Sequence, residues 1–103
     1  MYQLVLCTCP DTVVANQIAR CLVEEKLAAC VNLIPGITSV YSWQGKVESS
    51  SEVQLVIKTT TEMFEPLSLK INQLHPYEVP EIIALNIQQG DKHYLNWISE
   101  SIN

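Results

Sequence analysis

Three segments of the chain carry apolar side chains at both odd and even positions, and this pattern constrains the fold more than any other feature. They span residues 4–7, 29–34 and 82–87. Each is short and bounded by proline, glycine or polar residues, as strands are. A strand with one face in water alternates apolar with polar residues. A sheet built from these segments must therefore be covered on both faces.

The segments between these strands show helical periodicity. Asp11 is placed to cap a first helix. Thr61 is placed to cap a second helix, and Pro76 ends it. Gly90-Asp91 is placed to cap a third helix. The apolar stripes of the three helices are Val14, Ala15, Ile18, Cys21 and Leu22; Phe64, Leu67, Ile71 and Leu74; and Tyr94, Leu95, Ile98 and Ile102. The sequence thus predicts three amphipathic helices.

A long hairpin occupies the middle of the chain. Pro35-Gly36 interrupts an apolar run that resumes at Ile37 and continues to Trp43, which is typical of one strand with a kink. Gln44-Gly45-Lys46 predicts the turn, and Val53, Leu55 and Ile57 alternate in the returning strand. The last strand should cover residues 82–88. The order β-α-β-β-α-β with a C-terminal helix predicts an α+β, ferredoxin-like antiparallel sheet.

Residues 1–103 have the length of a single domain, and 48% of them are hydrophobic, enough for one core. Two helices can cover only one face of the sheet, and only 17% of residues are charged. We therefore expect other copies of the chain to cover the second face in an obligate oligomer. The hairpin, with Tyr41 and Trp43 near its tip, would offer an edge for strand addition.

Charge and hydropathy exclude several classes of function. The net charge is −5 and no basic stripe exists, which argues against nucleic-acid binding. No stretch has the length of a membrane span, and the first residues lack the basic start of a signal peptide. We expect a cytoplasmic protein whose four cysteines (Cys7, Cys9, Cys21 and Cys30) stay reduced, with buried packing as their default role.

The segment His75-Pro76-Tyr77-Glu78-Val79-Pro80-Glu81 concentrates the side chains with the richest chemistry. Its two prolines exclude a helix interior and impose a stiff, extended connector. The alternatives are a well-capped loop between a helix and a strand, or a binding segment.

His75 and Cys7 form a pair of soft ligands at a helix end and a strand end that this topology can bring together. Thiolate with imidazole suits copper or zinc better than magnesium or calcium. The alternative is a buried thiol beside a histidine that interacts with the helix dipole. An enzyme with Cys7 as nucleophile, His75 as base and Glu81 as orienter is a further hypothesis, but no oxyanion loop accompanies it.

Lys58 is predicted to share the uncovered face of the sheet with Glu52 and Gln54. If another subunit covers that face, this cation becomes partly buried and requires a carboxylate or a ligand. Otherwise it is an ordinary solvated lysine.

The motifs together resemble the CutA divalent-cation tolerance proteins. They are Leu6-Cys7-Thr8 with Pro10-Asp11, Leu27-Ala28-Ala29-Cys30-Val31-Asn32, Ile34-Pro35-Gly36, Tyr41, Trp43 and Gly45, Lys58-Thr59, the segment from His75 to Glu81, and the closing Gly90, Tyr94 and Trp97. The resemblance extends over nearly the entire chain.

The resemblance implies a PII-like homotrimer that responds to divalent metal ions and is not an enzyme. Copper ligands in bacterial members are a cysteine, matched by Cys7, and two adjacent histidines, of which only His75 is present because Leu74 occupies the other position. The resemblance also implies a cleft between subunits involving Glu52, Lys58, Tyr77 and Glu81. A sensor that binds a small ligand in this cleft is the alternative function.

Overall fold

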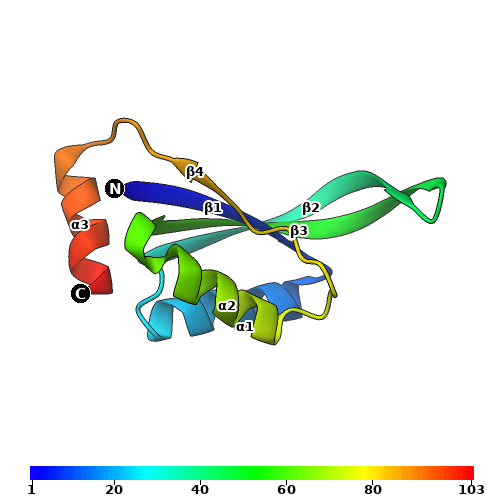
Figure 1. Ribbon diagram of the computed structural model, residues 1–103, viewed down its shortest axis with the longest axis horizontal. Helices are drawn as coiled ribbons and strands as arrows, with labels where there is room; N and C mark the ends of the chain where they lie inside the picture. The colour runs from blue at the N-terminus through cyan, green and yellow to red at the C-terminus, as the bar shows by residue number, and fades with distance from the viewer.

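The computed structural model describes all 103 residues and consists of a four-stranded sheet and three α-helices (Figure 1). In chain order the elements are β1 (Tyr2–Cys9), α1 (Thr12–Glu24), β2 (Cys30–Trp43), β3 (Lys46–Thr60), a 3₁₀ turn (Thr61–Met63), α2 (Phe64–Leu74), β4 (Ile83–Asn86) and α3 (Lys92–Ile102). None of these helices is long and apolar enough to cross a membrane.

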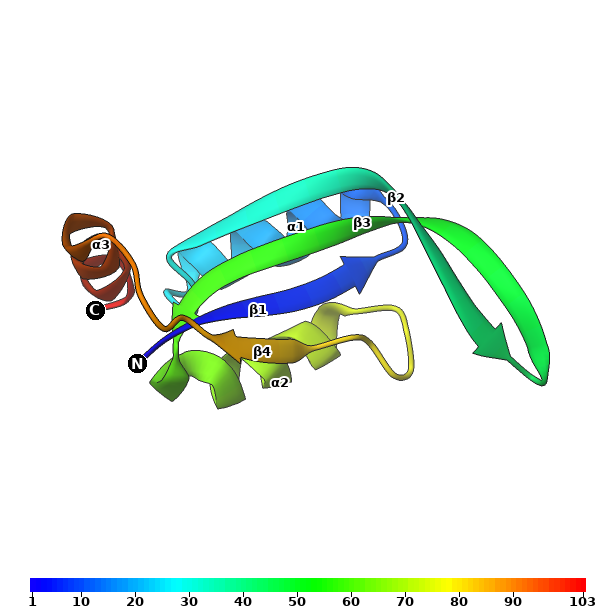
Figure 2. The same cartoon turned by 90° about the horizontal axis from the view of Figure 1, so that it is seen from above.

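The strands lie in the order β2-β3-β1-β4, and every neighbouring pair is antiparallel. Both α1 and α2 pack on the same face of this sheet (Figure 2). The predicted α+β, ferredoxin-like arrangement with a C-terminal helix is therefore confirmed. Strand alternation decides which side chains face the helices, because successive residues point to opposite faces.

The main core lies between the sheet and the two helices. It contains 12 buried residues: Val5, Cys7, Cys9, Ala15, Ile18, Leu22, Ala28, Val53, Leu55, Ile57, Leu67 and Ile71. The members from β1 and β3 alternate along their strands, as the sequence predicts. Burying each large aliphatic side chain contributes about 1.5–3 kcal/mol, so this face supplies most of the stability of one protomer.

The opposite face of the sheet is apolar too, and no element of the chain covers it. Register places Leu6 between Val56 and Ile83, and Leu4 between Lys58 and Leu85. Ile83 and Leu85 are 52% and 50% exposed. We refer to Leu4, Leu6, Val56, Ile83 and Leu85 as the open apolar face. Its composition agrees with the sequence pattern from which the fold was predicted.

The β2–β3 hairpin extends well beyond the rest of the sheet (Figure 1). A bulge between Ile34 and Ile37 bends β2, and Gly36 there has φ +76, which favours glycine. The turn residues Gln44 and Gly45 both have positive φ, as a type I′ turn requires. This arm gives the molecule a length of 45 Å and a radius of gyration of 14.2 Å, above the about 13 Å of a compact domain of this size.

α3 closes the end of the sheet near the N-terminus (Figure 1). Ile98 and Ile102 are buried together with Ala29, and the hydroxyls of Tyr2 and Ser99 lie 2.6 Å apart. The side chain of Asp91 accepts a hydrogen bond from the Tyr94 amide at 3.0 Å, so the predicted cap of α3 is confirmed.

Two predicted details are wrong. Thr61 does not cap the second helix: it opens the 3₁₀ turn, its hydroxyl donates to the Met1 carbonyl, and α2 begins at Phe64 without a side-chain cap. β4 covers Ile83–Asn86 rather than residues 82–88. Asn86 pairs with Gln3, so β1 has almost no residues left to pair with a longer β4.

Candidate metal centre and adjoining pocket

Cys7, Cys9 and His75 form a buried cluster of potential metal ligands. Cys7 and Cys9 are alternate residues of β1, so both point toward the helices, and each is 0% exposed. His75 follows the last residue of α2, where Pro76 prevents the helix from continuing, and is 7% exposed. One thiol sulfur from each cysteine and one ring nitrogen lie within 4.8 Å of one another. The structure thus brings together the predicted pair and adds a third donor.

Hydrogen bonds fix the orientation and tautomer of His75. Its Nε2 lies 2.7 Å from the Thr8 carbonyl oxygen, which can only accept, so Nε2 carries the proton. Its Nδ1 accepts a hydrogen bond from the Tyr77 amide at 3.1 Å. A metal that binds this ring must replace one of these two hydrogen bonds. The net contribution of such a bond is about 1 kcal/mol, well below the free energy of a metal–imidazole bond.

The surroundings of Cys7 favour its protonated form. The pKa of Cys7 is raised above its ordinary value by its hydrogen bond with Cys9, by burial, and by the charges of Cys9, Glu81 and Glu52. Cys7 is therefore a protonated thiol at neutral pH without a metal. Two thiols and an imidazole in apolar surroundings are the donor set of a soft metal, so the residues present fit copper.

Tyr77 connects this cluster to the surface. Its ring lies 4.6 Å from that of His75, measured between centroids, and its hydroxyl donates to Oε2 of Glu52 at 2.6 Å. Burial and the adjoining Glu52 raise the pKa of the Tyr77 hydroxyl. The side chain therefore stays a neutral donor across the physiological range.

A pocket of about 770 Å³ opens on the far side of Tyr77. It lies between the hairpin arm and the α2–β4 connection, and its lining comprises Thr8, Ser39, Val40, Tyr41, Trp43, Glu48, Glu52, Tyr77, Glu78, Val79 and Glu81. Four of these residues are glutamates, and no lysine, arginine or histidine accompanies them. The pocket presents a negative field to any ligand.

Glu52 is the most buried carboxylate of this lining, with 8% of its surface exposed. Its only hydrogen bond comes from the Tyr77 hydroxyl, and no basic side chain forms an ion pair with it. A buried carboxylate with a single donor is costly to desolvate.

Lys58 lies apart from the other three predicted cleft residues. It lies six positions after Glu52 in β3, about 20 Å along the strand. Its ammonium group donates to the side-chain oxygen of Asn32 and lies 3.9 Å from the Cys30 sulfur, on the face that the helices leave uncovered. Glu52, Tyr77 and Glu81 line one pocket, whereas a site that includes Lys58 would need that residue from another copy of the chain.

The catalytic arrangement considered for Cys7, His75 and Glu81 does not form. His75 is hydrogen-bonded to Thr8 and Tyr77, not to Cys7 or Glu81. The Cys7 thiol has a raised pKa and no exposed surface, the opposite of an activated nucleophile.

Several residues of the site were not found from the sequence. Cys9 was assigned a packing role, although the period of two in a strand places it beside Cys7 on one face. Glu48 and Tyr41 reach the pocket only because the arm bends. Nothing in the local sequence indicates the direction of that bend.

Comparisons with known proteins decide the family. Residues 3–101 match the family model described as CutA1 divalent ion tolerance protein. The chain belongs to this family. It is 52% identical over 101 residues, 98% of each chain, to the "Divalent-cation tolerance protein CutA" of Thermus thermophilus. A solved structure of the CutA1 protein from that organism superposes with a TM-score of 0.97 at 50% identity, covering all of both chains.

Two further CutA relatives are a longer mouse protein and a protein from Archaeoglobus fulgidus that is described as periplasmic. The mouse protein named "Protein CutA" is 52% identical over 93 residues, which are 90% of this chain and 52% of the mouse protein. A solved structure from Archaeoglobus fulgidus, described as a periplasmic divalent cation tolerance protein, has a TM-score of 0.97 and 38% identity with full coverage of both chains. The CutA domain therefore also occurs in longer chains.

Proposed function

We propose that this CutA protein confers tolerance to metal ions by binding copper or a similar soft metal at Cys7 and His75, without catalysing a reaction. The observation that carries the proposal is the buried cluster in which a thiol and an imidazole from two distant segments lie within 4.8 Å. Membership of a divalent-cation tolerance family supports a role in metal response. The buried, protonated Cys7 argues against nucleophilic catalysis.

Metal binding at this site would replace a thiol proton and a hydrogen bond with bonds to the metal. Cys7 gives up its thiol proton, and His75 exchanges one hydrogen bond for the metal. The imidazole is already held in place by the end of α2 and the ring of Tyr77, so little ordering is required. Such a site favours soft or borderline metals over magnesium and calcium.

We further propose that the protein acts as a homotrimer in the cytoplasm. The open apolar face supports assembly, since a contiguous apolar patch on a soluble chain marks an interaction site. The PII-like trimer that the family resemblance implies is a closed assembly in which each copy would cover the face of the next. All four cysteines are free, which supports a reducing compartment.

Titration calorimetry with Cu(I), Cu(II) and Zn(II) tests the metal assignment. Cys7→Ala and His75→Ala should each weaken binding of the preferred metal by at least about 100-fold, because loss of a direct ligand exceeds the 10–100-fold typical of outer residues. Cys21→Ala is the matched control, because Cys21 lies on α1 outside the cluster. Unchanged affinity in both cluster variants would remove the assignment.

A second candidate is a PII-like sensor of a small ligand, supported by the pocket of about 770 Å³ beside Tyr77. Glu52, Tyr77 and Glu81 would orient the ligand within one subunit, and Lys58 of a neighbouring copy would neutralise a negative group. Native mass spectrometry of protein purified without added ligand should then reveal a retained metabolite. Its loss in both Lys58→Ala and Tyr77→Phe supports this function, and retention in both excludes these residues.

A further inference from the structure

Cys9 is a buried thiol with no role in the two-ligand site proposed above. It lies two residues from Cys7 on the same face of β1, at the end of the strand beside the α2–β4 connection (Figure 2). Both cysteines have no exposed surface, and their sulfurs lie within 4.8 Å of each other and of a His75 nitrogen. An ordinary packing role does not require a second thiol at that distance from the first.

We propose that Cys9 is a metal ligand, so that Cu(I) is held by the thiolates of Cys7 and Cys9 with His75 as the third donor. This inference rests on the proposed function and specifies the chemistry of the same site. Each thiol releases its proton as its sulfur binds the metal, and no oxidant or reductant takes part. The ion is bound in the oxidation state in which it arrives.

The spacing of the two sulfurs suits a bridging metal. With metal–sulfur bonds of about 2.3 Å, two thiolates on one ion lie about 4.0 Å apart in a trigonal site and about 4.6 Å apart in a linear one. The donor atoms here lie within 4.8 Å of one another, so small side-chain rotations bring them into range. No movement of the backbone is needed.

A disulfide between the same cysteines fits the strand poorly. Alternate residues of an extended strand have Cα atoms about 6.8 Å apart, at the upper limit of the range that a disulfide spans. Both residues also lie within the regular pairing of β1 with β3, where Cys7 faces Leu55 and Cys9 faces Val53. Shortening the strand to join the sulfurs would disrupt these pairs, whereas a metal ion bridges the distance directly.

The donor set favours Cu(I) over zinc. A structural zinc site takes four ligands, usually in a tetrahedron, and this cluster supplies three. Leu74, the residue before His75, packs against the main core and offers no donor. Two soft thiolates and one imidazole in a dry environment match the preferences of Cu(I).

The acidic pocket provides a route for the cation. Thr8, between the two cysteines, and Tyr77, against the His75 ring, both line it. Its glutamates attract cations from solution and raise their local concentration. Rotation of Tyr77 would open the buried donors to this pocket.

The decisive measurement is Cu(I) affinity, determined by competition with the chromophoric chelator bicinchoninate under anaerobic conditions. Cys9→Ala should weaken Cu(I) binding by at least about 100-fold, because loss of a direct ligand exceeds the 10–100-fold typical of outer residues. Cys9→Ser, which keeps the size of the side chain but not the soft donor, should lose as much Cu(I) affinity as Cys9→Ala. Cys21→Ala should bind as the wild type does. Circular dichroism of each metal-free variant checks that it is folded.

X-ray absorption of the Cu(I)-loaded wild type gives a readout independent of any variant. Two sulfur neighbours at about 2.3 Å support the inference, and one sulfur neighbour overturns it. If Cys9→Ala keeps wild-type affinity while Cys7→Ala loses it, the inference fails and the proposed function stands. If wild type and Cys7→Ala bind Cu(I) equally, the proposed function itself fails.

Discussion

At the scale of single residues, Tyr77 couples the buried cluster to the pocket. It contacts His75 through its ring and its backbone amide, and Glu52 through its hydroxyl. Its hydroxyl is the one donor to a carboxylate that is 8% exposed. A single side chain therefore satisfies a buried charge and fixes a potential metal ligand.

Tyr77→Phe should lower the free energy of unfolding by about 1.5–3 kcal/mol at neutral pH, the range for hydrogen bonds to charged groups. Tyr41→Phe is the control, because Tyr41 lines the same pocket and is 43% exposed. Urea denaturation at one fixed protein concentration measures the free energy of unfolding of both variants. A Tyr77→Phe protein as stable as the control would show that Glu52 is solvated without its donor.

The difference in stability between the wild type and Tyr77→Phe should also depend on pH. The pKa of Tyr77 is raised in the folded state by burial and by Glu52, so its stabilisation is complete below the ordinary tyrosine pKa of about 10. As the pH rises above 10, the unfolded chain loses its proton first and the stabilisation decreases. The stability difference between wild type and Tyr77→Phe should therefore be smaller at pH 11 than at pH 8. A difference that grows with pH contradicts the raised pKa.

Sequence reasoning found Cys7 and His75 but not the whole cluster. The pair could be predicted because a strand end and a helix end meet in this topology and both residues are soft donors. Cys9 could have been found from strand periodicity alone. The hydrogen bonds that fix His75 could not, since they depend on the path of the backbone after Pro76.

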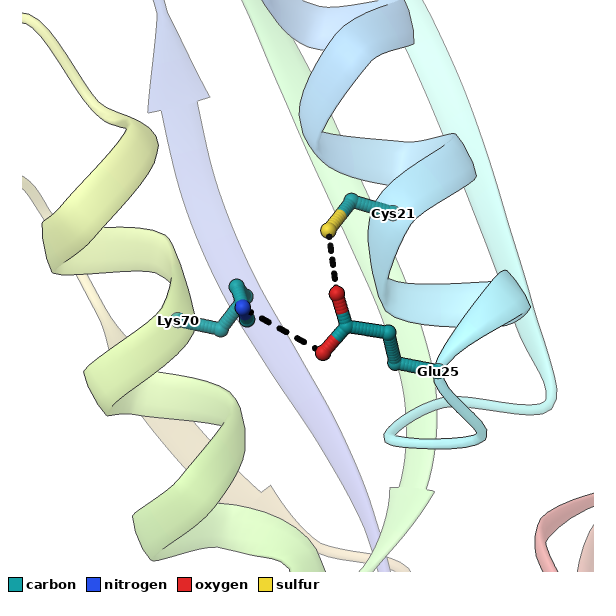
Figure 3. A network of polar contacts seen from close by, with 3 residues as sticks. All are labelled: Cys21, Glu25 and Lys70. Carbon is teal, nitrogen blue, oxygen red and sulfur yellow. Dashed lines mark hydrogen bonds and ion pairs between the residues drawn. The ribbon is translucent and has the colours of Figure 1, made fainter.

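At the scale of elements, α1 and α2 are joined on their outer side by one polar network (Figure 3). The Cys21 thiol donates to one oxygen of Glu25 at 3.2 Å, and Lys70 of α2 pairs with the other at 3.3 Å. The hydrogen bonds from Cys21 and Lys70 lower the pKa of Glu25. Because the network is exposed, it contributes little to stability compared with the buried aliphatic residues beneath it.

The cap of α1 allows a test of how a single side chain stabilises a helix. The side chain of Asp11 accepts a hydrogen bond from the Val14 amide at 2.9 Å and caps α1. Asp11→Ala should lower the free energy of unfolding by about 1 kcal/mol, and Asp11→Asn, which keeps the acceptor, should have little effect. Equal losses in Asp11→Ala and Asp11→Asn would indicate that charge, not the cap, is responsible.

The elements were predictable where side-chain periodicity decides them. Helical stripes and apolar runs gave the order and type of every helix and strand, and Gly36 and Gly45 located the bend and the turn. Element ends were less predictable, since they depend on partners distant in sequence. Thr61 bonds to Met1 instead of capping a helix, and β4 ends where β1 runs out of residues to pair.

At the scale of the whole molecule, the two faces of the sheet have separate roles. One packs on α1 and α2 and carries Cys7 and Cys9 of the buried cluster, whereas no element of the chain covers the open apolar face. The expectation that both faces are covered follows from the sequence pattern alone. The way in which another copy would cover the open apolar face does not, because it would depend on the direction of the bent arm.

Val56→Asp should convert the proposed trimer to a monomer. Val56 lies opposite Leu6 and Asn32 in the sheet, and an unpaired carboxylate buried there would cost several kcal/mol per copy. Val13→Asp on α1 is the matched control, because Val13 is 74% exposed. Sedimentation at micromolar concentration should give about three times 11.6 kDa for wild type and control, and one copy for Val56→Asp. A well-folded wild-type monomer under these conditions contradicts the trimer.

The Val56→Asp protein also separates the two candidate functions. Cys7, Cys9 and His75 belong to one chain, so a folded monomer should keep its affinity for Cu(I), measured by the same chelator competition. A sensor site that takes Lys58 from a neighbouring copy should instead lose its ligand, because the two halves of the site no longer meet. Loss of Cu(I) affinity in a folded Val56→Asp monomer would mean that a neighbouring subunit supplies a metal ligand, in conflict with the three-donor site.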